Sequence, residues 1–144
     1  MEIATVVGGG GTRLQVREWG RRDAPPILFV QGWSQHHLAF RRQLESALGD
    51  EFRWVALDLR GHGMSDVPAE VSAYTSEETW AANIAAVVEQ RGLTRPVIVG
   101  WSYGGYVVSD YLDRNGDGNV AGVNYVGWSV VVGEPTPHFV GRGS

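Results

Sequence analysis

Short runs of apolar residues alternate along the chain with longer segments in which apolar residues recur at helical spacing. The short runs predict β-strands and the longer segments predict amphipathic helices, because the two structures bury side chains with different periods. The predicted strands cover residues 3–7, 13–19, 27–30, 52–57, 96–99 and part of 120–132. The predicted helices cover residues 36–50, 75–92 and 106–112.

Local patterns refine these elements. The glycines at 8–11 are followed by neither a helix nor Lys-Ser/Thr, so they predict a hairpin turn rather than a phosphate loop. Thr75 and Glu78 form a capping-box pattern at the start of the second helix, which Gly92 ends. The apolar face of the first helix consists of Phe40, Leu44, Ala47 and Leu48.

After the two initial strands, strands and helices alternate, without an internal repeat or a low-complexity linker. This order predicts a single α/β domain over residues 1–144, built on a mostly parallel, doubly wound sheet. Ligands of such sheets bind beyond the carboxyl ends of the strands. The segment 31–33, Asp58 and Ser102 all follow directly after predicted strands, so we expect them to converge at that edge.

Composition narrows the choice of compartment and partner. The chain has 144 residues, a formal net charge of −4 and no cysteine. The absence of a basic stripe argues against nucleic acid as a partner. The apolar runs are too short to span a membrane, and the first residues lack the pattern of a signal peptide. The expected location is the cytoplasm.

We expect no cofactor and no metal ion. Asp113, Asn115 and Asp117 match the first half of a calcium-binding loop. The twelfth position of that loop, which requires a bidentate glutamate, is Asn124. A polar connection between a helix and a strand explains these residues more simply.

The strongest chemical signal is the passage from strand to helix at residues 100–105. Ser102 lies at the corner, and Gly100 and Gly104 occupy the positions two before and two after it. A G-x-S-x-G pattern between a strand and a helix predicts a nucleophile elbow, in which a strained serine presents its hydroxyl above the sheet. The N-terminus of the following helix favours negative charge beside that hydroxyl. Ser102 is therefore the candidate nucleophile.

Residues 29–33, 58–65 and 100–105 together make the chain resemble the α/β-hydrolase fold superfamily, and in particular its small esterases and cofactor-free haloperoxidase-like members. The resemblance implies an oxyanion hole formed by the backbone N–H groups of Trp33 and Tyr103. Because neighbours of an elbow serine face the pocket, the side chains of Trp33 and Tyr103 are expected to line an apolar acyl site, and packing in the core is the alternative. The family usually has histidine at the position of Gln31, and glutamine can still shape the loop by hydrogen bonding.

The same resemblance implies a catalytic acid and a histidine that come later in the chain, after further strands. The sequence therefore looks like the amino-terminal half of such a hydrolase, lacking its C-terminal strands and stopping near the start of a cap segment. Glu134 and His138 follow Ser102 in the family's order. Pro135 and Pro137 favour an extended segment there, so order alone does not make these residues triad partners.

Four other polar residues near the predicted strand ends are expected to lie outside the catalytic machinery. Asp58 is expected to fix the turn that follows it by accepting hydrogen bonds. His62, which lies inside that turn, is also expected to be structural. His36 and His37 are expected to be surface residues.

Three functions remain open on the sequence. The first is hydrolysis of small esters through Ser102, and the elbow serine argues against epoxide hydrolase chemistry, for which the family uses aspartate. The second is a non-catalytic fragment or binding module. The third is perhydrolase, haloperoxidase-like or lyase chemistry on the same scaffold. Residues 120–133 contain no charge, so a strand there would offer an apolar edge for self-association or for a complementing chain.

Overall fold

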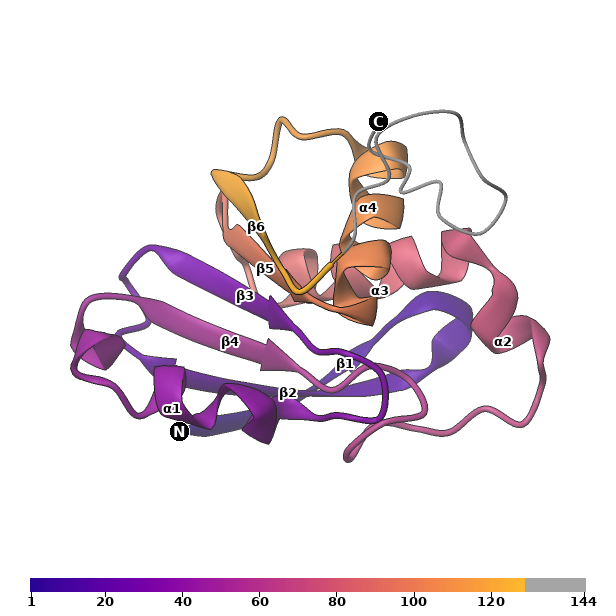
Figure 1. Cartoon of the computed structure of the whole chain (residues 1–144), viewed down its shortest axis with the longest axis horizontal. Helices are drawn as coiled ribbons and strands as arrows, with labels where there is room; N and C mark the ends of the chain where they lie inside the picture. Colours follow the sequence, from indigo (N-terminus) through magenta and orange to yellow (C-terminus); the bar gives the residue numbers. More distant parts are fainter. Residues whose placement is uncertain (129–144) are drawn as a thin grey trace.

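The computed structural model describes residues 1–128 (Figure 1). The elements in chain order are β1 (Glu2–Val7), η1 (Gly9–Gly11), β2 (Arg13–Gly20), β3 (Pro26–Val30), η2 (His37–Phe40), α1 (Arg41–Leu44), η3 (Ala47–Asp50), β4 (Arg53–Leu57), α2 (Ser72–Thr75), α3 (Glu77–Gln90), β5 (Val97–Trp101), α4 (Tyr103–Asn115) and β6 (Gly122–Val126). No described helix is both long enough and apolar enough to cross a membrane.

The strands form one six-stranded sheet in the order β1-β2-β4-β3-β5-β6. The strands β4, β3, β5 and β6 are parallel, β2 pairs antiparallel with β4, and β1 pairs antiparallel with β2. The predicted α/β class is confirmed, with the glycine turn η1 linking the β1–β2 hairpin. Because β3 pairs with both β4 and β5, the chain segments that follow these three strands emerge side by side.

The two faces of the sheet are packed by different helices. Leu28 of β3 and Ile98 of β5 belong to the core cluster that includes α3 and α4 residues, and both are fully buried. Phe29 points to the other face, where it packs with Phe40 and with Trp54 of β4. Burial on both faces explains why the central strands are apolar at consecutive positions.

The helix predicted over residues 36–50 is wrong, because the segment forms three short pieces, η2, α1 and η3. Ser46 has an extended backbone conformation, and its hydroxyl donates a hydrogen bond of 2.7 Å to the carbonyl oxygen of Gln43. In a continuous helix the Gln43 carbonyl would instead accept a hydrogen bond from the backbone N–H four residues later. Phe40 and Leu44 are buried as predicted, but Ala47 and Leu48 are exposed.

The N-cap of α3 lies one residue later than the sequence pattern indicates. Ser76 has the extended conformation of a cap, and its hydroxyl oxygen accepts a 3.2 Å hydrogen bond from the backbone N–H of Thr79. Thr75 instead ends the short helix α2. Serine and threonine are both good caps, and because Thr75 belongs to α2, Ser76 is the residue that caps α3.

Candidate active site

Ser102 occupies the single-residue corner between β5 and α4. Its φ of 52° and ψ of −120° lie in a region that residues other than glycine rarely adopt. Such a conformation costs on the order of 1–3 kcal/mol. It is held on both sides, because Ser102 N–H donates to the Val126 carbonyl (2.9 Å) and Ser102 C=O accepts from the Gly105 N–H (2.9 Å).

Gly100 and Gly104 flank this corner where other backbone passes very close. A Cβ atom on Gly104 would lie 2.6 Å from the carbonyl oxygen of Gln31, and it would overlap the carbonyl oxygen of Val30 even more severely. A Cβ atom on Gly100 would lie 3.0 Å from the Cα of Gly105. The start of α4 therefore rests directly on the end of β3.

The loop after β3 covers the serine. A Cβ atom on Gly32 would lie 3.2 Å from the Cβ and 3.7 Å from the Oγ of Ser102, so this loop has no room for a larger residue. Gln31 is fully buried, and its side-chain amide donates a 2.6 Å hydrogen bond to the carbonyl oxygen of Gln35. Gln31 thus shapes the loop by hydrogen bonding, as the sequence suggests.

Trp33 and Tyr103 meet above the corner. Their rings are edge to face, with centroids 5.5 Å apart, and 61% of the Trp33 surface is exposed. Neither backbone N–H has an acceptor among the described residues. Burial, followed by the negative charge of Asp110, raises the pKa of the Tyr103 hydroxyl above its ordinary value, so that hydroxyl stays neutral.

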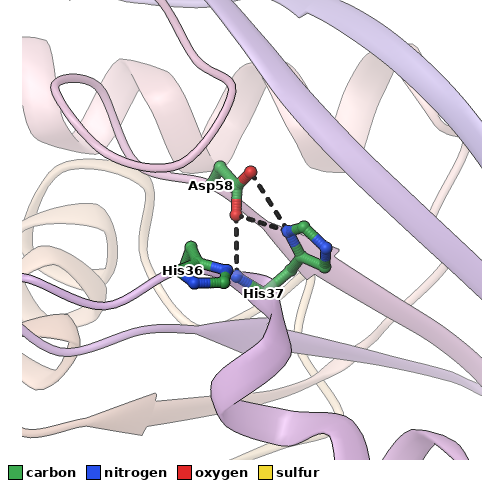
Figure 2. A group of neighbouring side chains, drawn as sticks. All are labelled: His36, His37 and Asp58. Carbon is green, nitrogen blue, oxygen red and sulfur yellow. Dashed lines mark hydrogen bonds and ion pairs between the residues drawn. The ribbon is translucent and has the colours of Figure 1, made fainter.

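Asp58, at the end of β4, links the loop after β3 to the turn after β4 (Figure 2). Its carboxylate is buried and accepts from the backbone N–H of His37 (2.7 Å), the Nδ1 of His37 (3.0 Å) and the backbone N–H of Met64 (3.1 Å). A Cβ atom on Gly63 would collide with the same carboxylate. Asp58 therefore fixes the following turn, as predicted, and also anchors a second loop.

The expectation that His36 and His37 are surface residues is wrong. Both are half-buried, and the side chain of His37 is only 13% exposed because its ring is held against Asp58. This contact joins residues 21 positions apart, so helical periodicity could not indicate it. The one clue in the sequence is that both residues follow neighbouring parallel strands.

His36, His37 and Asp58 are also the one group of side chains in residues 1–128 whose composition suits a metal ion, with ligand atoms within 4.8 Å of one another. The fit is poor. The Asp58 oxygens already accept three N–H donors, and the Nδ1 of His37, which would have to ligate a metal through this side, is one of them. In Figure 2 the two imidazole rings lie to different sides of the carboxylate.

His62 lies in the turn after β4, as expected, and its ring contacts both the turn and the loop after β3. Its Nδ1 is 3.0 Å from the carbonyl oxygen of Arg60, and its Nε2 accepts a 3.1 Å hydrogen bond from the backbone N–H of Ser34. Glu134 and His138, the two candidate triad partners, lie outside the described residues.

The sequence model of the family described as "alpha/beta hydrolase fold" matches residues 25–133. The chain therefore belongs to the α/β-hydrolase fold family. It is 36% identical over 119 residues to a non-heme chloroperoxidase of Streptomyces lividans, and the match covers 83% of this chain and 42% of that protein. It is 31% identical to epoxide hydrolase 1 of Caenorhabditis elegans, over 71% of this chain and 25% of that protein.

Among solved structures, an esterase from Rhodococcus sp. ECU1013 superposes with a TM-score of 0.84 at 37% identity. That match covers 92% of this chain and 48% of the esterase. The chain thus spans about half of the length of this esterase, and less than half of the chloroperoxidase.

Proposed function

We propose that Ser102 is the nucleophile of a hydrolase that acts on small esters. The observation that carries the proposal is the strained backbone of Ser102 between β5 and α4, with φ 52°. A serine that served only to cap the helix would adopt an ordinary extended conformation, and its side chain would accept a helix N–H; the side chain of Ser102 does not cap α4. Strain of this kind is characteristic of functional sites.

In this mechanism the Oγ of Ser102 attacks the ester carbonyl carbon while a base removes its proton. The carbonyl oxygen becomes an oxyanion, and the proposed donors to it are the N–H groups of Trp33 and Tyr103, which have no acceptor among residues 1–128. The tetrahedral intermediate then expels the alcohol, leaving an acyl group on Ser102 that water hydrolyses. The rings of Trp33 and Tyr103 are proposed to contact the acyl group.

None of the histidines in residues 1–128 forms a hydrogen bond with Ser102, so the structure brings neither a base nor its acid partner into contact with the proposed nucleophile. We propose that they come from later residues of the complete hydrolase. An unassisted serine hydroxyl reacts poorly at neutral pH, so the 144-residue chain is expected to have little esterase activity of its own.

A fluorophosphonate probe tests Ser102 directly, because its electrophilic phosphorus bonds to a serine oxygen with loss of fluoride and places a negatively polarised oxygen in the oxyanion hole. Without a base the reaction is expected to be slow. We expect slow labelling of the chain that peptide mapping assigns to Ser102 and that Ser102→Ala abolishes. Ser72→Ala, which changes an exposed serine of α2, is the matched control and should label like the parent chain. Equal labelling of the Ser102→Ala variant would refute the proposal. No labelling of a folded chain would favour a binding module.

A second activity is perhydrolysis, in which hydrogen peroxide replaces water in attacking the acyl-serine. The similarity to a bifunctional esterase/perhydrolase of Acinetobacter calcoaceticus, 38% identical over 104 residues, supports it. It requires the same nucleophile, so peracid formation from acetate and peroxide should also disappear in Ser102→Ala. If Ser102→Ala still formed peracid, perhydrolysis would not use Ser102 as its nucleophile.

A further inference from the structure

His62 connects two loops that the sheet brings to the same edge. A carbonyl oxygen can only accept a hydrogen bond, so the contact with Arg60 requires a proton on Nδ1 of His62. The backbone N–H of Ser34 can only donate, so Nε2 must be unprotonated. The two contacts specify a single neutral tautomer of the ring, with the proton on Nδ1.

The residue that His62 holds has an unusual backbone conformation. Ser34 has a φ of 58°, in the left-handed region, and it is one of three described residues other than glycine with a positive φ. The carbonyl of Gly32 accepts from Gln35 N–H (3.3 Å), which closes a tight turn around Trp33 and Ser34. A strained turn persists only where its surroundings hold it.

Three side chains hold this loop, and each does so at a different point. Gln31 bonds the carbonyl of Gln35, Asp58 bonds the N–H of His37, and His62 bonds the N–H of Ser34. The bond from His62 reaches the peptide unit next to Trp33. It therefore fixes the peptide plane on the carboxyl side of Trp33.

The ring of Trp33 is held by the same residue. It lies edge to face between His62 and Tyr103, with centroid distances of 5.5 Å to each. His62 thus contacts both the side chain of Trp33 and the backbone that follows it. Because Gly32 lies against Ser102, a rotation of the peptide planes around Trp33 would turn its free N–H relative to the Ser102 hydroxyl.

We propose that His62 is a positioning residue that fixes the orientation of the Trp33 N–H relative to Ser102. The catalytic part of this inference rests on the proposed function, in which the Trp33 N–H donates to the oxyanion. Its structural part, the bond from Ser34 to the neutral ring, stands independently and can be measured without any activity.

Two substitutions separate the two contacts of the ring. Asparagine places its amide near the position of Nδ1, so His62→Asn keeps a donor to Arg60 and loses the acceptor for Ser34. Glutamine reaches the position of Nε2, so His62→Gln restores an acceptor for Ser34. Both variants introduce a side-chain amide. They differ in whether this amide can bond the carbonyl of Arg60 or the N–H of Ser34.

Amide hydrogen exchange of the 144-residue chain provides the first readout. In His62→Asn the Ser34 amide should exchange roughly two- to tenfold faster, the range expected for losing one hydrogen bond. His62→Gln should return the rate towards that of the parent chain. The amide of Gly61, which donates to Asp66, reports on the turn itself and should be unchanged. Equal Ser34 exchange in all three proteins would overturn the proposal, as would a long-range ¹H–¹⁵N spectrum with the His62 proton on Nε2.

The rate of fluorophosphonate labelling at Ser102 provides the second readout. A misplaced oxyanion donor should slow labelling on the order of 10–100-fold in His62→Asn, with recovery in His62→Gln. Faster Ser34 exchange without slower labelling would show that the bond exists but does not position the donor, and would overturn the catalytic part. Labelling that Ser102→Ala does not abolish would refute the proposed function and leave the exchange result standing.

Discussion

Substitution of Gly104 tests the contact on which the elbow depends. Its Cα faces the end of β3, and a Cβ atom there would lie 2.6 Å from the Gln31 carbonyl oxygen and closer still to that of Val30. Carbon and oxygen atoms without a bond between them approach to about 3.3 Å, so the two elements would have to separate by roughly 0.7 Å or more. Both obstacles are backbone atoms of a central strand, which cannot rotate away as a side chain can.

The cost of Gly104→Ala should reach the upper part of the range for overpacking, about 3 kcal/mol. For a domain of this size the change corresponds to a melting temperature about 10 °C lower. Circular dichroism during a thermal ramp measures it. Gly118→Ala is the control, because a Cβ atom there meets nothing within 4 Å and its φ is not positive. Equal melting temperatures of the two variants would show that α4 does not rest on β3 as described.

Three further predictions concern the stability and association of the fold. Glu18→Ala should lower the free energy of unfolding, measured with urea, by about 3–5 kcal/mol, because Glu18 is the common carboxylate partner of the largely buried Arg53 and Arg91. A decrease of less than about 1 kcal/mol would contradict this prediction. Ser76→Ala should lower the free energy of unfolding by about 1 kcal/mol, and Thr75→Ala should lower it much less. A larger effect of Thr75→Ala would show that Thr75 is the N-cap, as the sequence pattern predicts. The chain should self-associate at micromolar concentration in sedimentation experiments, and Val126→Lys on β6, which is the last strand of the described sheet, should weaken association. A monomer in both proteins would refute this prediction.

The α/β class and the elbow could be predicted from sequence because each depends on local information. Strand and helix periods are visible in short windows, and Ser102 has glycine two positions away on either side. The parallel order then implies that the ends of β3, β4 and β5 converge. The contact of Gly32 with Ser102 also requires that β3 lie between β4 and β5 in the sheet. The sequence alone does not give this strand order.

The contacts that support the site could not be predicted in the same way. His37 binds Asp58, and Ser34 binds His62, across two loops whose relative position depends on the whole sheet. The choice of Ser76 over Thr75 as a cap and the break at Ser46 also depend on packing, since each competing residue has suitable local chemistry. The periodicity of apolar residues indicates helices and strands, but it contains no information on hydrogen bonds between loops.

The most direct test of the central claim uses the chain continued by the second half of the Rhodococcus esterase, which would supply the later residues of the fold. We expect this folded protein to hydrolyse p-nitrophenyl acetate. Ser102→Ala should lower its kcat at least about 10³-fold, while Ser72→Ala should leave kcat unchanged. If the Ser102→Ala protein, with an unaltered circular dichroism spectrum, hydrolysed the ester at the parent rate, Ser102 would not be the nucleophile.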